Sequence, residues 1–161
     1  MFMKKLIVLF GMMFFIMSSA LAQKGIQAAG VNLSYGTEIE SIGIGMKYQY
    51  NLTDNIRLEP SFNYFFENKG VDMFDINANV HYLFPMASNI RVYPSAGLTY
   101  AKWSADAGHG WEVSTSKFGL NLGGGAEFDI SDNLMMNVEL RYQLVSDFDQ
   151  SLIHVGIAYM F

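Results

Sequence analysis

Few side chains in this sequence could act in catalysis near neutral pH. It has no cysteine, and its three histidines, His81, His109 and His154, are the only candidates for a general base. None of the three lies in the spacing of a zinc-protease motif (H-E-x-x-H), and the chain has no nucleophile elbow (G-x-S-x-G). We therefore expect no catalytic, cofactor-binding or metal site, and for His81 and His154 a hydrogen-bonded structural role.

In several segments where apolar residues alternate with glycine and polar ones, charged side chains stand singly at the polar positions. Lys47, for example, stands between Met46 and Tyr48. Nine such charges, the ninth being Lys117, are five positive and four negative, so they nearly cancel, as a buried interior requires and a soluble surface does not. Eight of them form the predicted polar network: Lys47, Arg57, Glu59, Asp75, Arg91, Glu127, Glu139 and Arg141.

The segments that carry these charges are predicted β-strands. From Ile42 to Tyr50 every second residue is apolar and the residues between are glycine or polar, which is the period of a strand with two different faces. Eight segments share this pattern: 25–35, 42–50, 56–66, 73–84, 90–101, 117–128, 134–144 and 153–161. The sequence therefore predicts an all-β protein, an eight-stranded antiparallel up-and-down barrel.

Three short connections share an asparagine, namely Asn55, Asn89 and Asn133, each preceded by Asp or Ser. Because asparagine tolerates the left-handed conformation, we expect tight hairpin turns there. The repeat extends to a proline in two copies, Pro60 and Pro94. Proline cannot donate to a sheet ladder, so we expect a β-bulge near each one. If Tyr50 and Ile56 close the first turn, Lys47 faces Glu59 and forms a cross-strand ion pair.

Alternation alone fits both a membrane barrel and a soluble barrel with an apolar cavity. Across all eight segments the apolar face has no Asp, Glu, Lys, Arg, Asn or Gln, and it carries more aromatic volume than eight strands can enclose. Aromatic residues also gather near the strand ends, as in the interfacial girdles of membrane barrels. We therefore predict that the apolar face contacts lipid and the polar face lines the lumen.

The first 22 residues have the features of a cleavable signal peptide. Lys4 and Lys5 precede a short apolar run that ends in Ala20-Leu21-Ala22, so we expect the mature domain to span residues 23–161. Without the two lysines, 8 basic residues remain against 15 acidic ones, which argues against nucleic-acid binding. No apolar run of about 20 residues follows the leader, which excludes a helical span.

Over residues 23–161 the chain resembles the small eight-stranded outer-membrane barrels of Gram-negative bacteria, the OmpX-type and OmpA transmembrane-domain group. The resemblance implies an outer-membrane monomer in contact with lipid and lipopolysaccharide, with periplasmic termini and asparagine turns. It also implies external loops at 36–40, 67–72, 102–116 and 146–151. The last strand looks like the signal that the barrel-assembly machinery recognises in this class: Val155, Ile157, Tyr159 and Phe161.

Three functions remain open from the sequence. The first is a non-enzymatic barrel with a packed polar lumen and a structural or surface-interaction role. The second is a small-solute channel, in which the lumen charges are a selectivity lining. The third is a lipid-modifying enzyme that uses one of the histidines. We further expect Trp103 and Trp111 to anchor the longest loop at the membrane interface, with contact to a partner as the alternative.

Overall fold

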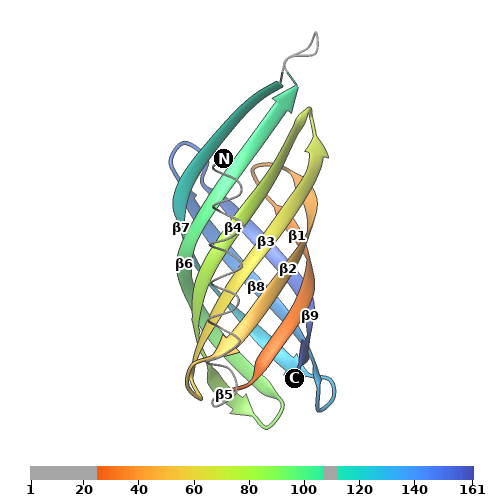
Figure 1. Ribbon diagram of the computed structural model, residues 1–161, viewed down its shortest axis with the longest axis vertical. Coiled ribbons are helices and arrows are strands. Elements are labelled where there is room, and N and C mark those ends of the chain that lie inside the picture. Colours follow the sequence, from red (N-terminus) through yellow and green to blue (C-terminus); the bar gives the residue numbers. More distant parts are fainter. Residues whose placement is uncertain (1–24, 107–111) are drawn as a thin grey trace, which may run out of the picture.

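The computed structural model describes residues 25–106 and 112–161, and in them the chain forms a closed antiparallel barrel of tilted strands (Figure 1). The expected signal peptide, His109 and Trp111 lie outside these residues. No helix in the described residues is long and apolar enough to cross a membrane. The strands are β1 Gln27–Gly36, β2 Ser41–Asn51, β3 Ile56–Asn68, β4 Val71–Tyr82, β5 Phe84–Ala87, β6 Ile90–Asp106, β7 Glu112–Asp129, β8 Leu134–Val145 and β9 Gln150–Met160.

The nine labelled strands form eight strands of the barrel wall, each of which we call a stave. Only Leu83 separates β4 from β5, and both pair with β6, so together they form one stave of the wall. Every other stave pairs with its neighbour in sequence, and β1 pairs with β9 to close the cylinder. The eight-stranded up-and-down barrel predicted from the alternation is confirmed.

The faces are also as predicted. Phe62 and Leu140 point outward with 38% and 62% of their surface exposed, whereas their neighbours Asn63 and Arg141 are 1% and 4% exposed. An outward apolar band is stable only against lipid, because in water it would be a continuous hydrophobic surface. The alternation therefore places the polar side chains in the lumen.

The hairpin turns expected at Asn55, Asn89 and Asn133 form, but none of these asparagines adopts the left-handed conformation. The backbone carbonyls of Asn55, Asn89 and Asn133 accept hydrogen bonds from the next hairpin, from Leu83 N (2.6 Å), Asp129 N (2.9 Å) and Met160 N (2.6 Å). In the described residues, positive φ among non-glycine residues occurs at Glu40, Lys69 and Asp147, in turns at the opposite end of the barrel. The prediction of left-handed asparagines is wrong. We call the two ends the asparagine-turn end and the long-hairpin end.

The expected bulges at Pro60 and Pro94 are also wrong. Register shifts occur instead in β3 between residues 65 and 68 and in β5 between residues 85 and 87. The prolines are accommodated by gaps, because the β2–β3 ladder lacks pairs beside Pro60 and the stave opposite Pro94 is interrupted at Leu83. Omitting a pair removes the need for the missing N–H without bending the strand.

The turns at the long-hairpin end are shorter than the expected external loops. Lys69 and Gly70 alone connect β3 to β4, with φ of 53° and 80°, as a two-residue type I′ turn requires. Most of 102–116 is strand, so β6 and β7 form a hairpin that projects beyond the other staves (Figure 1). Pairing of β7 with β8 stops at Gly119, so residues 113–118 of β7 pair with β6 alone.

An exposed ion pair joins two of these turns. Lys69 Nζ lies 2.8 Å from Glu40 Oε2. Its hydrogen bond and positive charge hold the pKa of Glu40 below the usual 4.5. Because the folded pKa is the lower one, any stability from this pair is present above pH 4.5 and is lost as the pH falls through the lowered value.

Candidate functional site

All eight predicted network residues lie on the inner face of the barrel. Seven are buried, and Arg91, near the asparagine-turn end, keeps 23% of its side chain exposed. They fall into three groups along the lumen, two built from ion pairs and one from amides. The lumen is therefore filled by its own polar side chains.

The first group is built on Glu127, which binds two arginines. Glu127 accepts two hydrogen bonds from Arg57, from Nη1 at 2.6 Å and Nη2 at 3.0 Å, and a third from Arg91 Nε at 2.5 Å. Arg91 also binds Asp129, with Nη2 2.6 Å from Oδ1. The bidentate geometry fixes the guanidinium of Arg57 against a carboxylate that no solvent reaches.

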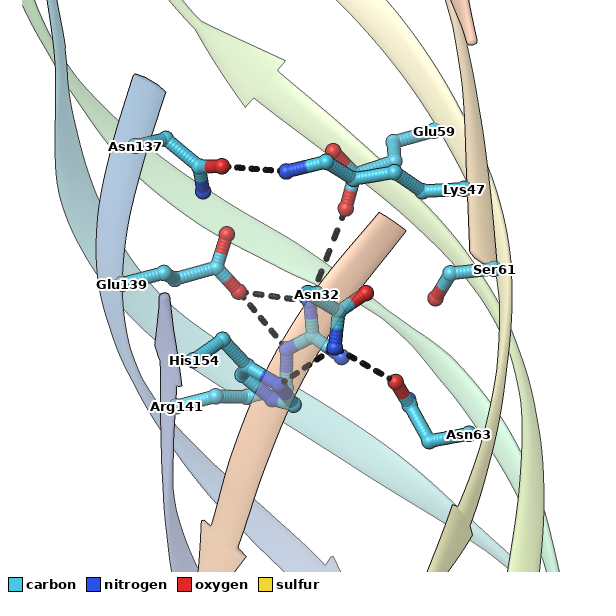
Figure 2. A pocket seen from close by; sticks show the side chains of 9 residues that line it. All are labelled: Asn32, Lys47, Glu59, Ser61, Asn63, Asn137, Glu139, Arg141 and His154. Carbon is cyan, nitrogen blue, oxygen red and sulfur yellow. Dashed lines mark hydrogen bonds and ion pairs between the residues drawn. The ribbon is translucent and has the colours of Figure 1, made fainter. Parts of the chain in front are cut away.

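The second group lies in the middle of the lumen (Figure 2). Arg141 Nη2 lies 2.5 Å from Glu139 Oε1 and 3.6 Å from Glu59 Oε1. Lys47 donates across the lumen to Asn137 and pairs in the sheet with Ser61. The expected cross-strand pair of Lys47 with Glu59 is wrong, because Asn51 pairs with Arg57 at the turn and the register differs by two residues.

The third group surrounds Asp75 with amides instead of cations. Asn63 and Asn77 each donate to Asp75 Oδ1 at 2.7 Å, and Gln143 donates to Oδ2 at 3.2 Å. Gln150 continues this chain by donating to Gln143 at 3.1 Å. Sequence reasoning identified the aspartate through its charge but did not identify these neutral partners.

The two described histidines differ. His154 Nδ1 lies 2.6 Å from Ser34 Oγ, which is the structural role expected of it. His81 is fully buried and stacks on Tyr93 with ring centroids 4.4 Å apart. Neither ring nitrogen of His81 has a hydrogen-bond partner within the described residues. Its Nε2 instead lies 3.7 Å from Glu59 and 3.8 Å from Glu139, so the expected hydrogen-bonded role does not hold for His81.

Two apolar clusters lie near the two ends of the lumen, and sequence reasoning missed both. The long-hairpin plug is Ile39, Phe65, Met73, Ala101, Trp103, Val145 and Leu152. The asparagine-turn plug is Ala28, Met135 and Ala158, with Met160 against it. The available signal was a pair of adjacent apolar residues at a strand end, such as Leu144-Val145, where the alternation ceases and both faces become apolar.

Trp103 belongs to the long-hairpin plug and not to the membrane interface. It is 9% exposed and contacts the ring of Phe148, with centroids 4.6 Å apart. The expectation that Trp103 anchors a loop in the interface is wrong, because its position in β6 has the inward parity of Ala101 and Thr99. Above the plug, a pocket of about 350 Å³ opens between β7 and the β8–β9 turn.

One small cavity lies among the polar side chains of the lumen. The cavity among Asn32, Lys47, Glu59 and Arg141 measures about 10 Å³, close to the space of one water molecule. Lumen glycines make this packing possible. A Cβ on Gly125 would lie 2.7 Å from the hydroxyl of Tyr93, so this glycine leaves the space that the ring occupies.

The fold, the outward apolar face and the packed polar lumen define an integral outer-membrane β-barrel protein. The chain belongs to the outer membrane protein β-barrel domain family, whose model matches residues 7–161. It is accordingly a protein of the bacterial outer membrane. A search of curated proteins found no significant match.

Solved structures of several outer-membrane barrels are similar. The N-terminal barrel of OprF from Pseudomonas aeruginosa has a TM-score of 0.74 at 17% identity, covering 86% of this chain and 98% of that chain. Neisserial surface protein A has 0.70 at 16% identity, covering 84% and 96%. Ail of Yersinia pestis, in complex with the heparin analogue sucrose octasulfate, has 0.64 at 20% identity, covering 86% and 100%. At these identities the likeness establishes the fold.

Proposed function

We propose that this protein is a non-enzymatic, non-conducting barrel of the outer membrane with a structural or surface-interaction role. The closed lumen is the observation that supports this proposal. A solute would have to displace the long-hairpin plug and then the buried ion pairs. His81 and His154 lie between the plugs, away from any lipid substrate.

The proposal is tested by conductance in planar lipid bilayers. We expect the full mature protein to give no discrete current steps, because the lumen cavity is about the size of one water molecule. Far-UV circular dichroism of the same lipid preparation is the control for a folded barrel. Steps whose size changes in Lys47→Ala or Glu59→Gln would instead establish the channel function.

The same proposal extends to maturation and assembly. We propose that residues 1–22 are removed on export, and that the barrel-assembly machinery reads the last strand. Val155, Ile157 and Tyr159 support this role because they point outward on β9, and Phe161, directly after the strand, is also exposed. Strand β9 also forms the closing pair with β1, so its recognition would hold the barrel open until the last ladder forms.

Lipopolysaccharide is the partner that the turn charges favour. If the long-hairpin end is external, its turns and strand ends are acidic: Glu38, Glu40, Glu67, Asp72, Asp106, Glu112, Asp147 and Asp149, against Lys69, Lys102 and Lys117. This charge disfavours a polysulfated ligand like that in the Ail complex. It favours divalent cations shared with lipid phosphates.

A deletion strain tests this role in the envelope. We expect greater sensitivity to detergent and to EDTA, because fewer carboxylates would hold the cations that bridge lipopolysaccharide. Complementation with the intact gene should restore resistance. A form in which Glu38 and Glu40 are replaced by glutamine should restore it only in part. A deletion strain as resistant as the parent, with unchanged adhesion to surfaces, would contradict both the structural and the surface role.

A further inference from the structure

Three potential metal ligands converge in the middle of the lumen from three different strands. His81 Nε2 comes from β4, Glu59 Oε1 from β3 and Glu139 Oε2 from β8. The imidazole nitrogen lies 3.7 Å and 3.8 Å from the two oxygens, and all three atoms lie within 4.8 Å of one another. The imidazole is the second observation beyond the acidic pair, because it is fully buried, has no hydrogen-bond partner in the described residues and points at both carboxylates.

We propose that His81, Glu59 and Glu139 bind one divalent transition-metal ion, with Zn²⁺ as the best match. Bonds of about 2.0–2.2 Å in a tetrahedral site place ligand atoms about 3.4 Å apart. Two of the three separations therefore need to shorten by only a few tenths of an ångström. One nitrogen and two oxygen ligands suit Zn²⁺ better than Mg²⁺ or Ca²⁺, which prefer oxygen alone.

The surroundings hold the two carboxylates as a metal site requires. Gln49 donates to the other oxygen of Glu59 at 2.6 Å, and Arg141 binds the other oxygen of Glu139 at 2.5 Å. The hydroxyl of Tyr93 donates to the ligating oxygen of Glu139 at 3.0 Å. Such hydrogen bonds orient metal-binding carboxylates. Both glutamates also line the small cavity next to this cluster.

The net charge of the lumen indicates that a proton on His81 is the competitor of the metal ion. The ion-pair and amide groups contain four basic residues, Lys47, Arg57, Arg91 and Arg141, and five acidic ones, Glu59, Asp75, Glu127, Asp129 and Glu139. The sum is −1 when the site is empty and +1 with Zn²⁺, so the ion changes the sign of the net charge and not its size. A proton on His81 would bring the sum to zero, and the experiment must distinguish the two.

The plugs determine how the ion enters. Because the long-hairpin plug covers one end of the lumen and the buried Arg57–Glu127 pair fills the other, an ion has to enter before the barrel closes. Metal present during refolding should then be retained against a chelator, and metal offered to the folded barrel should be excluded. Surface carboxylates at the turns behave in the opposite way, because a chelator removes their ions at once.

The test is to unfold the full mature protein in urea and refold it into detergent micelles with Zn²⁺ or with EDTA. After washing with EDTA, the first sample should hold about one Zn²⁺ per barrel and the second none. Refolding with Co²⁺ should give the visible absorption of a tetrahedral site. X-ray absorption should report nitrogen and oxygen ligands and no sulfur.

His81→Asn should lose the bound ion, and Glu59→Gln should reduce it. The matched control is His154→Asn, which removes the other lumen histidine and should retain the ion. If a variant does not fold, the wild-type comparison still decides. Wild-type protein without retained metal, or with an imidazolium at His81 in nitrogen NMR after refolding with Zn²⁺, overturns the proposal. Equal retention by His81→Asn also overturns it. Bilayer conductance tests the closed lumen separately.

Discussion

Replacing Glu127 with alanine is expected to lower the free energy of unfolding by about 3–5 kcal/mol. The carboxylate accepts three hydrogen bonds from Arg57 and Arg91. Without it, the fully buried guanidinium of Arg57 keeps only its bond to Asn51, and a charge remains without a counter-ion in the lumen. Urea unfolding in lipid vesicles, followed by tryptophan fluorescence, measures the difference.

Asp129→Ala is the matched control for this prediction. Asp129 lies on the same strand and also pairs with Arg91, but a quarter of its side chain is exposed and Arg91 keeps Glu127 when it is lost. We expect a loss of about 1 kcal/mol or less. Equal losses in the two variants would mean that burial of Arg57 is not what makes Glu127 important.

Replacing Phe65 with alanine is expected to cost about 3–5 kcal/mol, because it leaves a void in the long-hairpin plug. Phe65 is fully buried among Met73, Trp103 and other plug residues. The lost ring contacts cannot be recovered unless the strands move inward. The same unfolding assay measures this cost.

The adjacent residue is the control. Phe66 has the same side chain on the same strand but faces outward, with 47% of its surface exposed. Phe66→Ala replaces ring contacts by lipid contacts and leaves no internal void, so its cost should be clearly smaller. A larger cost for Phe66→Ala would indicate that the lipid face, and not the plug, dominates stability at this end.

The sequence predicted which way side chains point far better than what they touch. Orientation follows from a period of two that each strand carries locally, which is why Phe62 and Arg141 lie on the expected faces. Register depends on how the turn closes. The β2–β3 turn places Lys47 opposite Ser61, and a two-residue change keeps a side chain on its face while it changes the partner.

Contacts across the lumen could not be predicted from the sequence, for a related reason. Glu59 and His81 come from the neighbouring strands β3 and β4, but Glu139 comes from β8, which pairs with neither. No spacing in the sequence therefore brings the three residues together. The plugs were missed because their apolar residues lie on the inward face, which the pattern marks as polar along most of each strand. Phe65 and Val145 could have been identified from their apolar neighbours, Phe66 and Leu144.

The unequal lengths of the staves also affect how the barrel moves. Residues 113–118 of β7 have a strand on one side only, so the amide protons on their free edge meet solvent. Lys117 donates hydrogen bonds to Ser146 and Asp147 and so links β7 to the β8–β9 turn across this gap. We therefore expect the amide protons of residues 113–118 to exchange fastest and those of the central strands slowest. Opening of the barrel would then begin at this unpaired edge.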